Sequence, residues 1–375
     1  MRVHLFNPDN DLALAANATH FTPPKAALRL RQAGAMLPLW YAEPGDKVMC
    51  YGVNAQWLEQ MQQTFALDVD VFDHHGEAPG LCADPWGWSL AARQDYLDEG
   101  FPTSSLPTNE QLSAMRQLSH RRTALEVSRR LHKALPFEIC GDGVETINIE
   151  EAAEAISRYG RAFVKAPWSS SGRGVVDTAK VGIDKALRMA GEFQKAQGSA
   201  IIEKAYDKSA DFAMIFECAG GECRYLGLSV FTTDTSDGYT GNLIASENRR
   251  RMSLGQHCSL QQADAIRGAL QQIISNLIAP YYNGILGVDM LVTTDGCIHP
   301  SVEINLRKTM GYVALRIADT CVACGAEGTL AVRPGTLADA TNFSVLSIEN
   351  HRIASGSLFL TPPNAYFAFE VKVGQ

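Results

Sequence analysis

The sequence lacks the features that mark membrane, secreted or nucleic-acid-binding proteins. No run approaches the ~18 apolar residues of a membrane-spanning helix, and the opening MRVHLFNPDNDLAL has neither the basic region nor the long apolar stretch of a signal peptide. The 375 residues carry a formal net charge of −8, whereas nucleic acids and anionic membranes favour a basic face. We therefore expect a cytoplasmic protein that acts on small molecules, with no nucleic-acid or membrane partner. The oligomeric state is left open.

The cysteines also lack a pattern. There are nine, an odd number, and they are scattered without a repeating spacing. This predicts reduced thiols rather than a disulfide framework. Cys321 and Cys324 form a lone Cys-x-x-Cys with no second pair to complete a zinc site, so we expect a buried pair on a helix.

The chain has enough apolar residues, 46% of the total, to build two or three domains. Residues 1–105 alternate strand-like runs, including 37–40, with helical stretches, which is typical of an open α/β sheet. The Pro/Ser/Thr-rich segment 101–108 then predicts a linker, closed by a helix capping box at Thr108-x-x-Gln111. We expect α+β subdomains at 106–204 and 205–375.

A Ser/Gly loop follows the strand-like residues 162–167. Glycines let backbone N–H groups approach phosphate oxygens, and Lys165 on the incoming strand supplies a point charge. The loop suits a nucleoside triphosphate, although it is not a Walker A motif, because no Gly-Lys-Ser/Thr follows. An ordinary hairpin turn is the alternative. The candidate phosphate-binding residues are Lys165, Ser170, Ser171, Gly172 and Gly174.

The most informative segment is the strand-like run 302–307. Alternation places Glu303, Asn305 and Arg307 on one face and apolar residues on the other. An acid, an amide and a guanidinium in one row suit a metal and phosphates, since Mg²⁺ prefers oxygen ligands and bridges carboxylates to phosphates. An amphipathic edge strand facing water is the alternative.

The turn before strand 302–307 decides whether Asp289, on the preceding strand, lies on the same face as Glu303. A two-residue Asp295-Gly296 turn would place Asp289 on the face opposite Glu303. A three-residue loop at 294–296, or a bulge at 299–300, would keep both acids on one face. We expect one of these devices.

In order and spacing, Lys165 with its loop, the segment 201–204, Asp211, Asp289 and the strand 303–307 resemble the ATP-grasp superfamily, over about residues 110–315. The resemblance implies an N-terminal open α/β domain followed by a two-subdomain ATP-grasp fold. It implies ATP with one or two Mg²⁺, Mn²⁺ being an alternative metal, and a ligase that activates a carboxylate as an acyl phosphate for attack by an amine. An ATP-grasp kinase acting on a hydroxyl, and a nucleotide-binding protein without turnover, are the alternatives.

The resemblance also implies roles for individual residues. Lys165 and Arg307 would act on the transferring phosphate, and Arg122, or else Arg121, would replace a nucleotide-binding lysine of the family. The adenine would meet Glu203, Lys204 and Ala205, the ribose Asp211, and the metal Asp289, Glu303 and Asn305.

The sequence also allows predictions for two further segments, residues 7–11 and 232–259. The Asn/Asp-rich residues 7–11 follow the first strand, and we interpret them as a turn in preference to a ligand-binding loop. Residues 232–259 are rich in Gly, Ser and Thr and include Arg249, Arg250 and Arg251. They suit either a solvated charge run or a lid, and we predict a lid that is poorly ordered without ligand.

Overall fold

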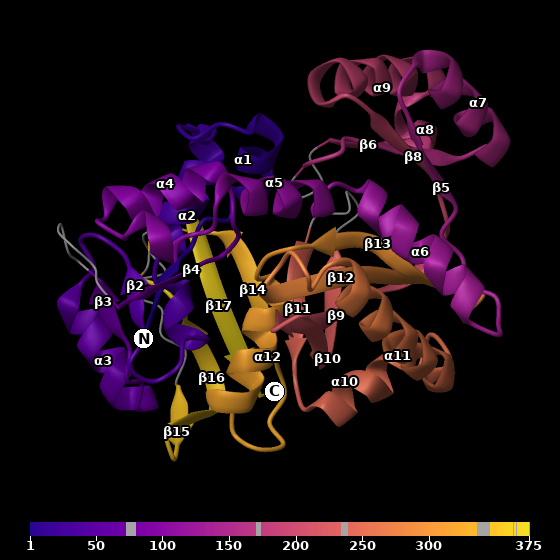
Figure 1. Cartoon of the computed structure of the whole chain (residues 1–375). Helices are drawn as coiled ribbons and strands as arrows, with labels where there is room; N and C mark the ends of the chain where they lie inside the picture. Colours follow the sequence, from indigo (N-terminus) through magenta and orange to yellow (C-terminus); the bar gives the residue numbers. More distant parts are fainter. Residues whose placement is uncertain are drawn as a thin grey trace.

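A computed structural model describes residues 1–72, 80–169, 174–233, 239–335, 346–362, 364 and 366–374 of the chain. Three β-sheets organise these described residues (Figure 1). Among the described residues, no helix is both long and apolar enough to cross a membrane.

The N-terminal sheet has the order β3-β2-β1-β4, and every pair of neighbours in it is parallel. Val3 and Leu5 pack on one face and Phe6 on the other, which is the pattern of a sheet covered on both sides. The strand expected at 37–40 is instead a 3₁₀ helix: Pro38 has no N–H for a ladder, and all four residues are buried together. The elements are β1 (Arg2–Leu5), α1 (Asn10–Ala16), α2 (Lys25–Ala33), η1 (Leu37–Trp40), β2 (Lys47–Met49), α3 (Ala55–Phe65), β3 (Asp70–Phe72), β4 (Cys82–Pro85), α4 (Leu90–Asp98) and η2 (Thr103–Ser105).

A small antiparallel sheet, β5-β8-β6-β7, stands off from the rest at the upper right of Figure 1. Alternate residues such as Val164 and Ile202 pack beneath its helices, and this turns Lys165 and Glu203 to the opposite face. The elements are β5 (Gly143–Thr146), α7 (Ile149–Tyr159), β6 (Ala162–Lys165), β7 (Val175–Asp177), α8 (Thr178–Val181), α9 (Ile183–Gln197) and β8 (Ala200–Lys204).

The large sheet is antiparallel, with the order β13-β12-β9-β10-β11-β14-β17-β16-β15. Phe212, Met214 and Phe216 of β9 pack into a core with α5, α6 and α11, while Ile215 faces α12. The sequence groups residues 106–142 with the central subdomain. In the structure, α5 and α6 of this segment pack on the large sheet instead. The predicted capping box at Thr108 and Gln111 begins α5. The elements are α5 (Asn109–Leu118), α6 (Arg122–Ala134), β9 (Lys208–Ala219), β10 (Glu222–Thr233), β11 (Tyr239–Ile244), α10 (Glu247–Leu254), α11 (Leu260–Leu277), β12 (Gly284–Thr293), β13 (Ile298–Asn305), α12 (Met310–Thr320), β14 (Gly328–Pro334), β15 (Ser347–Glu349), β16 (Arg352–Phe359) and β17 (Phe367–Val373).

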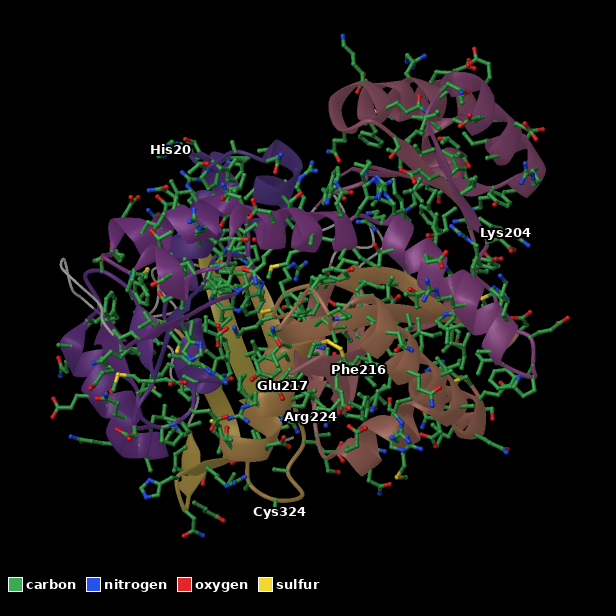
Figure 2. The ribbon with its side chains drawn as sticks, viewed as in Figure 1. His20, Lys204, Phe216, Glu217, Arg224 and Cys324 are labelled. Carbon is green, nitrogen blue, oxygen red and sulfur yellow. A yellow bond between two sulfur atoms is a disulfide. The ribbon has the colours of Figure 1, made fainter. Side chains whose placement is uncertain are left out.

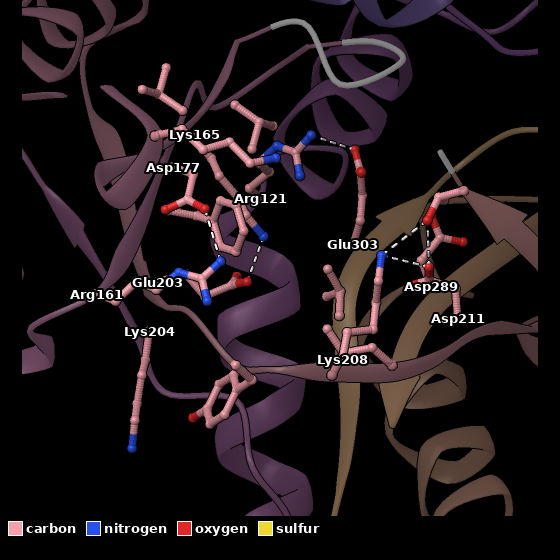
Figure 3. Close-up of a pocket in the computed structure, with 18 of the residues that line it drawn as sticks. Arg121, Arg161, Lys165, Asp177, Glu203, Lys204, Lys208, Asp211, Asp289 and Glu303 are labelled. Atoms are coloured by element: carbon pink, nitrogen blue, oxygen red, sulfur yellow. Dashed lines mark hydrogen bonds and ion pairs between the residues drawn. The ribbon is translucent and has the colours of Figure 1, made fainter. Parts of the chain in front are cut away.

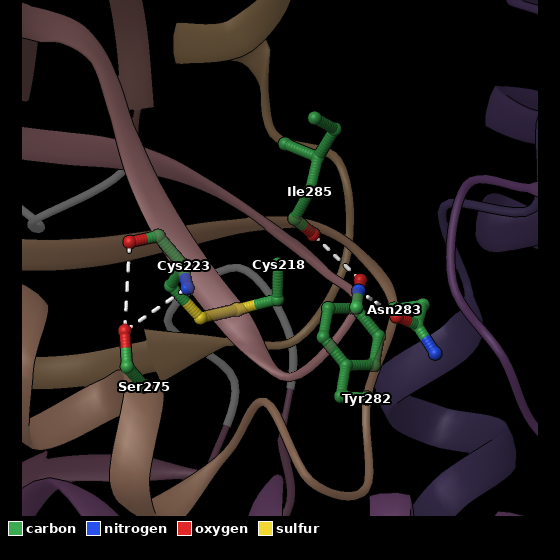
Figure 4. The surroundings of a disulfide bond; sticks show 7 residues. Cys218, Cys223, Ser275, Tyr282, Asn283 and Ile285 are labelled. Carbon is green, nitrogen blue, oxygen red and sulfur yellow. Dashed lines mark hydrogen bonds between the residues drawn. A yellow bond between two sulfur atoms is a disulfide. The ribbon is translucent and has the colours of Figure 1, made fainter.

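The expectation of reduced thiols is wrong for one pair, because a disulfide joins Cys218 to Cys223 (Figure 4). These residues lie directly opposite each other on β9 and β10, and direct cross-strand partners have Cβ atoms close enough to be bridged. The expected buried Cys-x-x-Cys pair is also wrong. Cys321 is buried where α12 ends, whereas Cys324 is exposed beyond it (Figure 2).

The expectation that residues 232–259 are poorly ordered is wrong for 232–233 and 239–259, whereas closure over a ligand stays a prediction; residues 234–238 lie outside the described residues. The segment forms β11 and α10, and its arginines have partners within the protein. Arg249 pairs with Glu327 at 2.8 Å, Arg250 donates to the Ala245 carbonyl, and Arg251 makes two bonds with Asp264. These contacts, together with the burial of Arg250, offset the cost of ordering.

Candidate active site

A cavity of about 890 Å³ lies between the small sheet and the β9, β12 and β13 strands of the large sheet (Figure 3). Each sheet turns one polar face toward it. A cleft between two domains, with a few charged groups converging on it, is the usual form of a ligand site. The small sheet contributes Phe163, Lys165, Asp177 and Glu203, and the large sheet contributes Lys208, Asp211, Asp289, Leu291 and Glu303.

Lys165 and Glu203 form a buried ion pair in this cavity. Lys165 Nζ lies 2.5 Å from Glu203 Oε1, and each residue is 5% exposed. Burial alone would raise the pKa of Glu203, but the nearby Lys165 ammonium holds it below its usual value. The next residue, Lys204, also lines the cavity, and its side chain extends away from Asp289 and Glu303 (Figure 3).

The β12–β13 hairpin has the three-residue loop that keeps Asp289 and Glu303 on one face, and not the one-residue bulge that was its alternative. Val292 pairs with Ile298 around this loop, and an irregularity between Asp289 and Leu291 then shifts the register by two residues, which keeps the face and places Asp289 directly opposite Glu303. The expectation that the two acids share a face is thereby confirmed. Asn305 joins them, because its Nδ2 donates to Asp289 Oδ2 at 2.9 Å.

Asp289 is electrostatically unfavourable as an anion, even though Arg121 pairs with its neighbour Glu303. Burial, with the neighbouring Glu303 charge, raises the pKa of Asp289 to about 7. No group of three His, Cys, Asp or Glu side chains is arranged to hold a metal in the described part of the chain. Two carboxylates and an amide oxygen nevertheless fit Mg²⁺, which keeps several waters and takes its remaining ligands from phosphates.

Arg121, rather than Arg122, occupies the cavity. Its Nη2 lies 2.9 Å from Glu303 Oε1 and donates to Ser169 Oγ at 3.1 Å, so it connects the Ser/Gly-loop side to β13 (Figure 3). Arg122 instead points toward Glu145 at 3.5 Å and does not line the cavity. Neighbouring residues at the start of a helix point about 100° apart, which corrects the choice of Arg122.

Asp211 lines the cavity and forms an ion pair there with Lys208, which the sequence does not predict. Lys208 Nζ lies 2.7 Å from Asp211 Oδ2, although residues three apart point to opposite faces of a regular strand. A register shift between β9 and β12 near Lys208 accompanies this contact, and the sequence carries no signal for it.

Two other candidates, Ala205 and Gly174, do not line the cavity. The Ala205 N–H donates to the Arg161 carbonyl at 3.0 Å, so it is already used, and Ala205 does not line the cavity. Gly174 has φ +73° and serves the turn after the loop, where a side chain would crowd Ser169. Ser170, Ser171 and Gly172 lie outside the described residues.

Arg307 lines a second cavity of about 570 Å³, which shares Asp289 and Glu303 with the first. Its guanidinium binds both oxygens of Asp11, the closest contact being Nη2 to Oδ2 at 2.8 Å. The turn expected within residues 7–11 is present at 8–9, and α1 then begins at Asn10. The segment does more than turn the chain, because Asp11 in the first turn of α1 holds Arg307 and Asp9 lines the second cavity.

Comparison with known proteins identifies the architecture. No protein-family model and no curated protein sequence matches the chain. Among solved structures, it is similar to N5-carboxyaminoimidazole synthetase of Staphylococcus aureus complexed with ADP (10% identity, TM-score 0.50, 100% of this chain and 93% of that one). It is also similar to a Campylobacter jejuni biotin carboxylase in an ATP-type complex (11%, 0.52, 99% and 87%) and to the biotin carboxylase domain of Hydrogenobacter thermophilus 2-oxoglutarate carboxylase with MgADP and bicarbonate (12%, 0.51, 100% and 86%). The chain has the ATP-grasp fold.

The three sheets follow one another along the chain in the arrangement of the ATP-grasp fold. The expected fold class is confirmed: an N-terminal open α/β domain is followed by the two-subdomain ATP-grasp fold. The boundaries at residues 105 and 204 stay predictions, as do the roles of the individual site residues.

Proposed function

We propose that the protein is an ATP-dependent ligase that phosphorylates a carboxylate and lets an amine attack the resulting acyl phosphate, releasing ADP and phosphate. The observation that supports this most is the meeting of two cavities at Asp289 and Glu303. A nucleotide in the first cavity could present its terminal phosphate at this junction, where a carboxylate held in the second cavity could attack it.

The charges on the two sides of the junction suit phosphoryl transfer, in which positioning and electrostatics supply most of the catalysis. On the nucleotide side, Lys165 and Arg121 offer cations to phosphate oxygens, and Asp211 offers a carboxylate to ribose hydroxyls. On the other side, Asp11 fixes the Arg307 guanidinium. Mg²⁺ bound by Asp289, Glu303 and Asn305 would offset the charge of the phosphates.

Product analysis tests the reaction class. With ATP, Mg²⁺, a panel of carboxylates and an amine, we expect ADP, free phosphate and an amide in equal amounts. ADP with a phosphorylated substrate and no free phosphate would instead indicate a kinase. Tight ATP binding without any ADP across the panel would indicate a nucleotide-binding protein without turnover.

Mg-ATP is expected to raise the melting temperature by several degrees, because a ligand that binds only the folded state stabilises it by mass action. EDTA should remove most of the shift, since Asp289 and Glu303 would then face the phosphates without an intervening cation. Differential scanning fluorimetry with ATP, with Mg-ATP and with EDTA measures this. An ATP shift indifferent to metal would argue against the Asp289–Glu303 site.

A further inference from the structure

The second cavity has an apolar body. Its walls come from both the N-terminal domain and the large sheet, and they include Phe6, Leu30, Trp86, Met310 and Phe369. A ligand that fills this space would lose water from a hydrocarbon or aromatic portion, which favours binding by roughly 25 cal/mol per Å² of apolar surface. The body of the ligand is therefore expected to be apolar, and the charged groups of the lining decide what else it carries.

Most of the charged groups on this cavity already have a counter-charge. Arg307 is bound by Asp11, and Arg333 Nε donates to Glu370 at 2.9 Å. Asp289 and Glu303 belong to the proposed metal site at the junction. Within the described ranges, the charged lining residues are Asp9, Asp289, Glu303, Arg307 and Arg333. Asp9 is thus the charge that remains to be explained.

Asp9 is buried in the wall of the second cavity and is incompletely paired. It is 4% exposed, lines the cavity, and its Oδ1 has no hydrogen-bond partner in the described part of the chain. It precedes α1, yet its side chain makes no capping bond to that helix. The nearest cation, Arg31, is 3.9 Å from Asp9 Oδ2 but only 2.5 Å from Asp95.

The electrostatics of Asp9 agree with a missing cation. Burial raises its pKa above the usual value, and Arg31 offsets only part of that effect. A buried carboxylate is stable when it is paired and hydrogen-bonded, so this position is unfavourable as it stands. A ligand that brings an ammonium group would supply both the charge and the donors.

We infer that Asp9 binds the protonated amino group of a substrate with an apolar body, seated in the second cavity. The inference rests on the proposed function, because it names the class of compound that the ligase would take. Two sources share this chemistry: an amino acid whose own carboxylate is activated, and a separate substrate that carries an amine.

The test compares matched probes. Leucine and phenylalanine are each measured against the acid that lacks the amine (4-methylpentanoate, 3-phenylpropanoate) and the amine that lacks the carboxylate (3-methylbutylamine, 2-phenylethylamine). Isothermal titration calorimetry is carried out with Mg²⁺ and a non-hydrolysable ATP analogue present. We expect compounds with the amine to bind about tenfold or more tightly than those without it, because a buried charge-assisted hydrogen bond is lost.

Asp9→Asn should remove this preference, since it keeps the volume and takes away the charge. Asp98→Asn is the matched control: it makes the same change on α4, at an exposed side chain that bonds Gln94 and does not line the cavity, so it should keep the preference. Equal binding of the deaminated acids, an unchanged preference in Asp9→Asn, or no binding by any amine would overturn the inference.

ADP release separates this result from the proposed function and identifies the source of the amine. Release that requires the amino acid's own carboxylate assigns the amino group to the activated substrate, and release with the decarboxylated amine plus another carboxylate assigns it to the second substrate. Amine binding that depends on Asp9 without ADP release would support the site while the ligase proposal fails. ADP release with acids that ignores both the amine and Asp9 would support the ligase and overturn the site.

Discussion

Glu303→Gln is expected to lower the rate of ADP formation by at least about a hundredfold while leaving the fold intact. The change keeps the side-chain volume but removes the negative charge opposite Asp289, and a neutral amide is a poorer ligand for a hard cation. The loss of a group that stabilises transferring charge typically costs 10²–10³ in rate. Coupled detection of ADP at saturating ATP and a range of Mg²⁺ concentrations measures the effect.

Glu327→Gln is the matched control for this variant. Both substitutions remove a glutamate that pairs with an arginine, but Glu327 lies outside both cavities and its partner is Arg249. Its rate should equal that of the wild type. Glu303→Gln that turns over normally at saturating Mg²⁺ would show that Glu303 is not a metal ligand, and an altered rate in Glu327→Gln would point to a general effect of lost ion pairs.

The polar face of β13 could be predicted because it depends on local rules. Alternation along a strand fixes which side chains share a face, and the parity of the hairpin loop fixes which partner they meet. These rules place Glu303 and Asn305 on one face, and they require a three-residue loop or a bulge if Asp289 is to join them. The sequence could not choose between these devices, nor could it show the two-residue register shift beyond the loop, because that shift depends on the pairing of the whole hairpin and not on the turn residues.

Contacts between distant segments were not predictable in the same way. Asp11 and Arg307 are 296 positions apart, and only the docking of the N-terminal domain on the large sheet brings them together. The choice of Arg121 over Arg122 depends on the rotation of α6 against β13, and the disulfide depends on the register of β9 and β10. Each of these features follows from packing rather than from residue type.

Lys165→Ala is expected to abolish measurable ATP binding and also to destabilise the protein by about 3–5 kcal/mol. Removing one partner of a buried pair leaves the other charge without compensation, and Glu203 is 5% exposed. His299 is the nearest other group to this carboxylate: its Nε2 is 3.8 Å from Glu203 Oε1, and in the wild type burial lowers the pKa of His299 to about 4. Urea unfolding followed by circular dichroism, with ATP titration in parallel, measures both losses.

The double variant Lys165→Met/Glu203→Gln separates the two effects, because it removes both charges and leaves no unpaired ion. It should recover much of the stability that Lys165→Ala loses, yet still fail to bind ATP if Lys165 contacts phosphate. The folded-state pKa of Glu203 is below its ordinary value of 4.5, so the pair stabilises the fold fully above that pH and less as the pH falls through the lowered pKa. The free-energy gap between wild type and double variant should therefore be constant from pH 6 to 8 and shift against the wild type below about pH 4.5. ATP binding by the double variant at wild-type affinity would mean that Lys165 only neutralises Glu203, and the phosphate contact would then pass to Arg121.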